Sequence, residues 1–354
     1  MNYRELFRVE GLPVFQNKMF PDRESAINCS KGDVVLVQDM DTGLIFNAAF
    51  EPDLLQYDED YQNEQAHSLI FREHLSSVKD IIQGHFGNKS IIEVGCGKGY
   101  FLEYLLALGY NIIGLDPAYE GDNPRVVKAC FAPDLGMKAD CIVLRHVLEH
   151  IKNPYQFLRQ IADANGNQGK IYIEVPCFDW ICDHCAWFDI FYEHVNYFRE
   201  SDFSGLFEEI YESGHVFGGQ YLYLVANLAS LVPPEGNAVN PFTFPIDFLD
   251  KIQRYSARAN SRKIAVWGGA SKGVIFSFYM KKQGVDVDVI IDINPDKQGK
   301  YIASTGTKVL SPSEAMSLLS PGDDIFVMNS NYLEEIKQLS HNQFNYLRVD
   351  QDEF

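Results

Sequence analysis

Two neighbouring residues in the middle of the chain, Glu193 and His194, are the strongest candidates for moving a proton. They lie in the aromatic segment Trp187–Phe198, which reads WFDIFYEHVNYF, directly after Tyr192. A histidine can accept a proton near neutral pH when a neighbouring carboxylate stabilises its charged form. We therefore predict that His194 is a general base supported by Glu193 and Tyr192. The same pattern also fits an aromatic core helix with one hydrogen-bonded histidine.

A second group of residues, within Ser90–Asp116, could hold a nucleotide-like cofactor. The segment reads SIIEVGCGKGYFLEYLLALGYNIIGLD. Its glycines let the backbone approach a ligand, and Asp116 can hydrogen-bond both hydroxyl groups of a ribose. Tyr100 stands where the dinucleotide fingerprint needs a third small residue, which disfavours a dehydrogenase. The candidate cofactor-binding residues are Glu93, Gly95, Gly97, Asp116, Phe131 and His146.

The stretch from residue 42 to residue 68, TGLIFNAAFEPDLLQYDEDYQNEQAHS, mixes aromatic, amide and acidic side chains. One interpretation is a solvated loop that leads into a helix. The other is a lid whose side chains stack on a small ligand and hydrogen-bond to it. The residues with this role are Tyr57, Tyr61, Asn63 and Gln65.

One metal-binding pattern is the string HVLEH at residues 146–150, which matches the inverted zinc-protease motif. The string follows directly on the apolar run Ala139–Leu144, where the edge of a sheet gives way to a helix. We therefore interpret His146 as a ligand-facing residue, and Glu149 and His150 as residues that anchor the next helix.

A second pattern is the cysteine group in PCFDWICDHCAWFD. Cys182 and Cys185 have the spacing of half a zinc site, with Cys177 nearby. No second pair is present elsewhere in the sequence, so buried thiols are the favoured interpretation, and metal binding by the three cysteines stays open. We expect no resident metal ion.

The composition of the chain excludes several classes of protein. A 354-residue chain with 46% apolar and 22% charged residues is typical of a soluble globular protein. Its net charge of −19 repels phosphate backbones, so we expect no nucleic-acid partner. No apolar run could span a membrane, the N-terminus lacks a signal-peptide pattern, and the seven cysteines are scattered. We expect a cytoplasmic monomer or homodimer with a small-molecule substrate and no membrane partner.

Apolar runs typical of strands alternate with helical patterns through the middle of the chain. The expected strands are Ser90–Val94, Asn111–Leu115, Arg125–Phe131, Ala139–Leu144, Lys170–Val175 and Gln220–Asn227, and the expected helices are Leu69–Phe86, Phe101–Leu108 and Pro154–Ala164. This alternation predicts an α/β fold with a parallel, doubly wound sheet, whose ligands bind at the carboxyl ends of the strands.

The C-terminal third repeats this architecture in the segment Lys263–Asp292. A strand is followed by the glycine turn Gly268–Gly273, a helix and a second strand. The turn lacks the dinucleotide fingerprint, but its amides and Lys272 could hold a phosphate group of the substrate. We predict three units: an N-terminal α+β lid and substrate region (1–75), a cofactor-binding core (76–232) and a Rossmann-like C-terminal domain (238–354), with Pro233–Asn237 as the linker before the last.

Taken together, these segments resemble one family of class I S-adenosylmethionine-dependent methyltransferases, the bacterial C-methyltransferases that act on nucleotide-linked keto-deoxysugars. The resemblance extends from about Pro13 to Leu339. It rests on the strings GLIFNAAFEPDLLQYDEDYQNEQ, EVGCGKGYFLEYL, RHVLEHIKNP, FYEHVNYF, FGGQY, VWGGASKG and DINPDKQGKY. Each string alone is weakly specific, but their combination in this order is specific.

The resemblance implies a reaction and roles for several residues. It implies S-adenosylmethionine as cofactor, with Tyr61 near its pocket, and catalysis by Glu193 and His194. His194 would abstract the proton next to a ketone, and the C-terminal domain would help to hold a nucleoside diphosphate.

The chain departs from the family in its N-terminal region, where the family has a zinc module built on two cysteine pairs. Cys29 is the single cysteine of the first ninety residues, and Thr42-Gly43 replaces a cysteine-containing string. A four-ligand zinc site cannot be built from one cysteine. Three functions therefore stay open: methyl transfer to a carbon of a nucleotide-linked sugar, O- or N-methylation of another small metabolite in specialised-metabolite or surface-glycan synthesis, and non-catalytic binding of S-adenosylmethionine.

Overall fold

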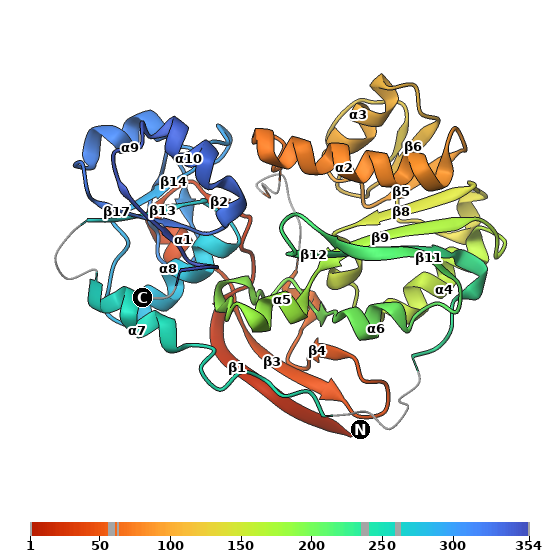
Figure 1. Cartoon of the computed structure of the whole chain (residues 1–354), viewed down its shortest axis with the longest axis horizontal. Coiled ribbons are helices and arrows are strands. Elements are labelled where there is room, and N and C mark those ends of the chain that lie inside the picture. Colours follow the sequence, from red (N-terminus) through yellow and green to blue (C-terminus); the bar gives the residue numbers. More distant parts are fainter. Residues whose placement is uncertain (1, 56–60, 62–63, 235–240, 259–262, 353–354) are drawn as a thin grey trace.

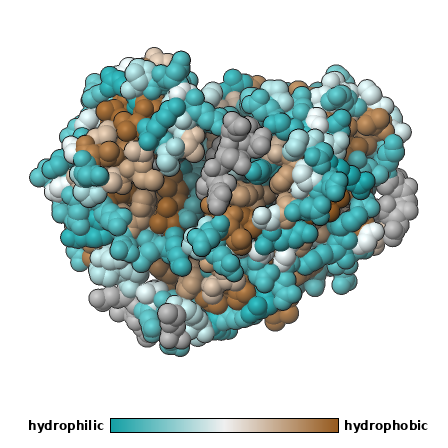
Figure 2. Space-filling model, turned by 180° about the vertical axis from the view of Figure 1, so that it is seen from behind, coloured by the Kyte–Doolittle hydropathy of each residue, from teal (hydrophilic) through white to brown (hydrophobic). Residues whose placement is uncertain are grey.

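The computed structural model describes residues 2–55, 61, 64–234, 241–258 and 263–352. Its two largest sheets form separate lobes, and a long N-terminal β-ribbon runs beneath and between them (Figure 1). Seen from behind, hydrophilic side chains cover most of the surface, and hydrophobic residues gather toward its middle (Figure 2). Within the described ranges, no helix combines the length and hydrophobicity needed to cross a bilayer.

A sheet of seven strands forms the centre of one lobe, in the order β11-β12-β9-β8-β5-β6-β7. The strands are β5 (Ile91–Val94), β6 (Ile112–Leu115), β7 (Val126–Val127), β8 (Cys141–Arg145), β9 (Lys170–Pro176), β11 (Ile210–Val216) and β12 (Tyr221–Asn227). Strands β5 to β9 run parallel, and β12 is antiparallel to both of its neighbours. The expected parallel, doubly wound sheet is therefore confirmed. The expected strand at Arg125–Phe131 is wrong in length, because only two residues of this edge strand pair with β6.

Helices cover both faces of this sheet, with α2 (Leu69–Phe86) and α3 (Tyr100–Ala107) on one face (Figure 1). The other face carries α4 (Pro154–Ala164) and α6 (Glu200–Ser204), and α5 (Phe178–Asp183) lies at its end. Successive strand residues point to opposite faces, so Ile91 packs with the α2–α3 side and Ile92 with the α4 side. The central strands β5, β8 and β9 are mostly apolar because both faces are covered, and Glu93 and Glu174 are their buried acids.

The second lobe contains a parallel five-stranded sheet in the order β16-β14-β13-β17-β18. Its elements are α7 (Asp250–Arg258), β13 (Ile264–Trp267), α8 (Lys272–Lys282), β14 (Val289–Ile291), β16 (Val309–Leu310), α9 (Pro312–Leu318), β17 (Asp324–Val327), α10 (Leu333–Leu339) and β18 (Asn345–Arg348). All four pairings are parallel, so this is a second Rossmann-like unit, as the sequence predicts.

The N-terminal chain is joined by backbone pairing to both lobes. Its elements are β1 (Tyr3–Pro13), β2 (Met19–Phe20), α1 (Arg23–Ile27), β3 (Lys31–Asp39) and β4 (Ile45–Asn47). Strand β4 pairs with β10 (Asn196–Tyr197) of the first lobe, and β2 pairs with β15 (Tyr301–Ile302) of the second. These pairings, together with buried side chains such as Val34 and Leu36, hold the region in place.

Several of the connections between strands and helices contain a short 3₁₀ helix. They are η1 (Pro52–Leu54), η2 (Pro133–Leu135), η3 (Leu148–His150), η4 (Trp187–Asp189), η5 (Leu228–Ser230) and η7 (Ser330–Tyr332). The segment Trp187–Phe198 contains one turn of 3₁₀ helix and then becomes extended up to β10. The alternative of an aromatic core helix is therefore wrong.

Candidate functional site

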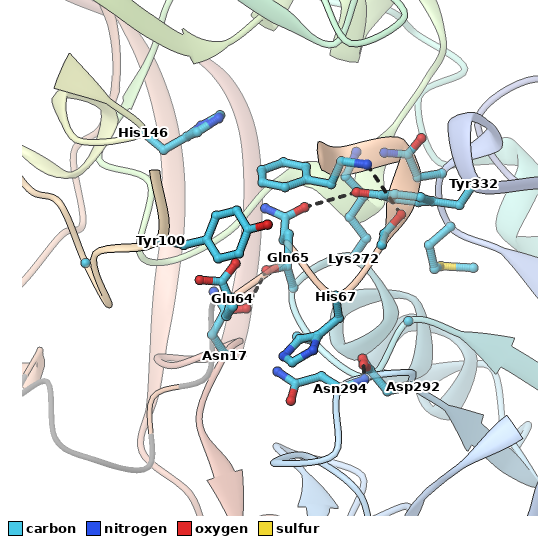
Figure 3. A pocket seen from close by; sticks show the side chains of 18 of the residues that line it. Asn17, Glu64, Gln65, His67, Tyr100, His146, Lys272, Asp292, Asn294 and Tyr332 are labelled. Carbon is cyan, nitrogen blue, oxygen red and sulfur yellow. Dashed lines mark hydrogen bonds between the residues drawn. The ribbon is translucent and has the colours of Figure 1, made fainter. Parts of the chain in front are cut away.

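A cavity of about 370 Å³ lies where the two lobes and the N-terminal chain meet. Its lining includes the turn after β5, the ends of β8 and β9, the segment before β10, and the turns after β13, β14 and β17. In the close-up, Tyr100 and His146 come from the first lobe, and Asp292 and Asn294 lie across the cavity on the second (Figure 3). Of the predicted site residues, those that line the cavity are Glu93, Gly95, Gly97, His146, Tyr61, Glu193, His194, Gln65 and Lys272.

The glycine turn after β5 forms one end of the cavity. Gly95 has a φ of +74°, and a Cβ atom there would lie 2.4 Å from Cγ2 of Val147. Glu93, at the end of the strand, is 2% exposed, and its Oε2 atom has no hydrogen-bond partner among the described residues. Burial raises the pKa of Glu93 to about 7, and the negative charge of Asp116 adds to the increase. A buried, unpaired carboxyl oxygen beside a glycine-rich turn fits a ligand that carries hydroxyl or amino groups.

Asp116 lies behind this turn and outside the cavity lining. Its Oδ2 atom accepts a hydrogen bond from the backbone N–H of Gly97 (2.8 Å), and its Oδ1 atom accepts one from Ala118 (2.8 Å). The carboxylate therefore fixes the shape of the glycine turn in this structure. A direct contact between Asp116 and a ribose stays a prediction.

Phe131 and Tyr192 also do not line the cavity. Phe131 is buried in the main hydrophobic core. The hydroxyl oxygen of Tyr192 accepts a hydrogen bond from the backbone N–H of Glu51 (2.9 Å), and the Tyr192 ring covers Gly32 so closely that a Cβ atom there would lie 2.2 Å from it. The structure thus gives Tyr192 a packing role next to the predicted catalytic residues Glu193 and His194. Two other predicted residues, Tyr57 and Asn63, lie outside the described residues.

His194 and Glu193 are both buried and come from the extended segment before β10. Burial lowers the pKa of His194 well below its usual value, and the nearby imidazole of His150 lowers it further. His194 therefore carries no charge at neutral pH and has a lone pair that can accept a proton. Burial raises the pKa of Glu193, whose Oε2 atom accepts a hydrogen bond from the backbone N–H of Gln16 (2.9 Å) and whose Oε1 atom is unpaired among the described residues.

Two residues of the predicted lid, Tyr61 and Gln65, connect parts of the chain that are far apart in the sequence. The hydroxyl oxygen of Tyr61 accepts a hydrogen bond from Nδ2 of Asn17 (3.2 Å), and Tyr61 is near enough to Glu193 to lower the pKa of that carboxyl group. Gln65 accepts a hydrogen bond from the hydroxyl group of Tyr332 in the second lobe (3.3 Å, Figure 3). Both residues therefore line the cavity and are hydrogen-bonded to residues of other segments that also line it.

Lys272, the first residue of α8, lines the cavity at the junction of the two lobes. Its Nζ atom lies 2.8 Å from Oδ2 of Asp189 and donates a hydrogen bond to Oε1 of Gln220 (2.8 Å). The ammonium group is thus already paired with a carboxylate, so a substrate phosphate would share it with Asp189.

Sequence reasoning missed Glu174, which is fully buried in β9. Its Oε1 atom lies 3.0 Å from Nε2 of His74 and 3.1 Å from Nε2 of His146, and its Oε2 atom accepts a hydrogen bond from the hydroxyl group of Tyr172 (2.6 Å). Burial alone would raise the pKa of Glu174, but Arg145 and His74 hold it well below its usual range. Burial would lower the pKa of His146, but Glu149 and Glu174 raise it to about 9. A single acid inside the apolar run KIYIEVP was the signal for this network.

Sequence reasoning also missed the polar wall of the second lobe. Asn294 is 1% exposed and lines the cavity, and its Nδ2 atom has no hydrogen-bond partner among the described residues. His67 points toward Asn294 and Asp292 across this end of the cavity (Figure 3). A buried amide donor without a partner indicates a polar ligand at this wall.

Two family comparisons match most of the two lobes. Residues 62–210 match a family described as a methyltransferase domain, and residues 247–346 match one described as a C-methyltransferase C-terminal domain. C-methyltransferase NovU from Streptomyces niveus is 21% identical over 328 residues, which is 81% of this chain and 77% of NovU. A ubiquinone biosynthesis O-methyltransferase from Shewanella pealeana is 27% identical over 116 residues, which is 28% of this chain and about half (48%) of that enzyme.

Solved structures also align with part of the chain. The PH0226 protein from Pyrococcus horikoshii aligns with a TM-score of 0.39 at 13% identity, covering 49% of this chain and 99% of that one. The plantazolicin methyltransferase BpumL, solved with S-adenosylhomocysteine and a monoazolic desmethylPZN analogue, aligns with a TM-score of 0.36 at 18% identity, covering 46% of this chain and 86% of that one.

Proposed function

Since this chain is a class I S-adenosylmethionine-dependent methyltransferase with a C-methyltransferase C-terminal domain, we propose that it methylates a carbon atom of a nucleotide-linked sugar. The similarity to NovU, a C-methyltransferase, covers 81% of this chain. The sequence motifs that resemble the sugar C-methyltransferases support the same substrate class.

The position of His194 carries the proposal. This buried, uncharged imidazole is close enough to His146 and to Lys272 for both of their charges to lower its pKa. The base is therefore within electrostatic reach of the first-lobe end of the cavity and of the second-lobe end. Such a position suits a reaction in which a methyl donor binds on one side and the methyl acceptor on the other.

Glu93, Gly95 and Gly97 are the residues that would hold the cofactor. When bound, S-adenosylmethionine supplies an electrophilic methyl group. The chain's own contribution is to align the acceptor, exclude water and take up a proton. We assign proton uptake from the carbon next to the acceptor's ketone to His194, with Glu193 beside it.

The second lobe would bind the nucleotide part of the acceptor. Gly268, Ala270 and Ser271 of the turn before α8 line the cavity, so a phosphate group could approach the N-terminus of this helix. Lys272 and Lys297 line this wall, paired with Asp189 and Asp292 respectively, and would share their charge with a phosphate group. Asn294 adds an amide donor. Gln65 and Tyr61 would close the cavity over the sugar.

The second candidate function is methylation of an oxygen or nitrogen atom in another small metabolite. The observation in its favour is the similarity of 116 residues to ubiquinone biosynthesis O-methyltransferases. That similarity covers 28% of the chain, whereas the NovU similarity covers 81%, so we favour the carbon acceptor.

The decisive experiment detects proton removal from carbon, which only C-methylation requires. The purified chain is incubated in D₂O with S-adenosylhomocysteine and a panel of nucleotide-linked keto-deoxysugars, and deuterium uptake is followed by NMR and mass spectrometry. We expect deuterium exchange at the carbon next to the ketone. When S-adenosylmethionine replaces S-adenosylhomocysteine, we expect methylation of the same carbon. Methylation of a hydroxyl or amino group without exchange would support the second candidate instead.

Replacing the proposed base gives the matching residue test. His194→Gln should lower both the exchange rate and turnover by about 10²–10⁴-fold, the usual contribution of a general base. Its affinity for S-adenosylhomocysteine, measured by calorimetry, should stay unchanged. His85→Gln is the control, because His85 pairs with Glu212 outside the cavity. Wild-type turnover in His194→Gln would assign the base to another residue.

A further inference from the structure

Three residues with metal-binding groups converge in the cavity beside the proposed base. Glu149, His150 and His194 each offer one ligand atom, and these three atoms all lie within 4.8 Å of one another. Within the described ranges, this is the one group of three or more histidine, cysteine or acidic residues that meets this condition. Glu149 and His150 belong to η3, and the backbone N–H of Val195 donates to the carbonyl oxygen of Glu149 (2.8 Å), which holds the two segments together.

The carboxylate of Glu149 has one oxygen available for a ligand. Glu149 is 1% exposed, and its Oε1 atom lies 3.3 Å from Nδ1 of His146. Its Oε2 atom is buried and has no hydrogen-bond partner among the described residues. Buried carboxylate oxygens are rarely left unpaired, because desolvation without a partner is costly. The unpaired Oε2 atom of Glu149 therefore indicates a positively charged or hydrogen-bonding ligand at this position.

His150 is oriented for coordination by its backbone contact. Its Nδ1 atom lies 2.8 Å from the carbonyl oxygen of Glu193. A carbonyl oxygen can only accept, so Nδ1 must carry the proton, and Nε2 of the neutral ring keeps its lone pair. Metal-binding histidines are commonly held in this way, with one ring nitrogen donating to a carbonyl group and the other bound to the metal.

We propose that Glu149, His150 and His194 form a binding site for a divalent transition-metal ion such as Zn²⁺. Two imidazoles and one carboxylate are the protein ligands of several catalytic zinc sites and of non-haem iron sites, which leave further positions open. The three ligand atoms all lie within 4.8 Å of one another, which is near the separation that ligands about 2.0–2.2 Å from one ion require. The motif HVLEH contains two of the ligands, but the third, His194, joins them only in the folded chain.

A metal ion at this site would compete with the proposed base, a consequence that rests on the proposed function. The lone pair of His194 can bind either a metal ion or a proton. We therefore expect Zn²⁺ to inhibit methyl transfer and a chelator to restore it. Zn²⁺ that binds without slowing turnover would overturn this competition.

The site is tested by binding, independently of activity. The full chain is treated with a chelator and titrated with Co²⁺, whose visible absorption reports the ligand geometry, and Zn²⁺ is then added to displace it. Glu149→Gln and His150→Gln should each lower Co²⁺ affinity by more than about 100-fold, because the loss of even an outer partner costs about 10–100-fold. His85→Gln, in a surface His–Glu pair, is the control and should bind Co²⁺ like the wild type.

The outcomes separate this proposal from the proposed function. Unchanged affinity for S-adenosylhomocysteine shows that a variant is folded. If the wild type does not bind Co²⁺, the metal site is overturned. The same holds if the wild type and both variants bind Co²⁺ equally well, whatever the methylation assay shows. Specific Co²⁺ binding without deuterium exchange on any sugar would instead support the site and count against the proposed substrate.

Discussion

The carboxyl group of Glu93 lies at the end of a strand that is buried on both faces, and this burial raises its pKa to about 7. An unfolded glutamate loses its proton near pH 4.5. Between these two pH values the folded chain therefore holds more protons than the unfolded chain. By linkage, the free energy of unfolding falls as the pH rises from about 4.5 to 7, and Glu93 contributes no further change above that range.

Glu93→Gln should remove this pH dependence, because glutamine does not titrate. Relative to the wild type, we expect the variant to gain free energy of unfolding between pH 5 and pH 8, by on the order of 2–3 kcal/mol. Urea unfolding at the two pH values measures the change. A constant difference between variant and wild type would show that Glu93 does not titrate in this range. The variant should also bind S-adenosylhomocysteine more weakly, since Glu93 is a proposed cofactor contact.

At the scale of elements, the turn between β5 and α3 depends on the absence of a side chain at Gly95. A Cβ atom would lie 2.4 Å from Val147, and the positive φ of +74° adds strain for any other residue. Gly95→Ala should lower the free energy of unfolding by more than the roughly 1–2 kcal/mol of the backbone strain alone, and it should weaken S-adenosylhomocysteine binding. Gly109→Ala is the matched control, with a φ of +87° and no atom within 4 Å. Equal losses in the two variants would rule out the contact with Val147 as the cause.

The network around Glu174 connects α2, through His74, to the ends of β8 and β9. Glu174→Gln would remove the buried carboxylate beside Arg145 and one of the two carboxylates beside His146. We expect the free energy of unfolding to fall by on the order of 3–5 kcal/mol. Glu212→Gln, which removes the partner of His85 at the surface, should cost less than about 1 kcal/mol. Chemical denaturation measures both, and a small loss for Glu174→Gln would contradict a structural role for the network.

At the scale of the whole molecule, Lys272 and Asp189 join the two lobes. Lys272 belongs to α8 and Asp189 to η4, and both side chains are largely buried. Lys272→Met should lower the free energy of unfolding by on the order of 3–5 kcal/mol, because the carboxylate of Asp189 loses its counter-charge while it stays buried. The double variant Lys272→Met, Asp189→Leu should recover most of this loss. A double-mutant cycle measures the coupling, and additive losses would show that the pair is not coupled.

Local patterns in the sequence predict most of the regular structure, because short apolar runs and capped helices are locally encoded. The helices Leu69–Phe86 and Pro154–Ala164 are confirmed to the residue. Each begins at a side-chain cap, Ser68 and Asn153 respectively, which accepts a backbone hydrogen bond from the first turn. The glycine turn after β5 and the second Rossmann-like unit are likewise found where the sequence predicts them.

The composition of the site depended on the tertiary structure, because long-range packing decides which side chains reach a shared cavity. Tyr192 is adjacent to Glu193 in the sequence, yet its hydroxyl group bonds to the backbone of Glu51 outside the cavity lining. Glu174 gathers partners from α2 and from the end of β8, and no local pattern specifies that arrangement.

The sequence by itself therefore determined the two α/β units, and it predicted a cofactor-binding role for the turn after β5 and an acid–base role for Glu193 and His194. Only the tertiary structure brought His194 to Glu149 and His150, and placed Asn294 of the second lobe in the same cavity. The physical reason is that neighbouring residues determine strands and turns, whereas contacts between segments far apart in the chain determine a buried site and the geometry of its ligand-binding groups.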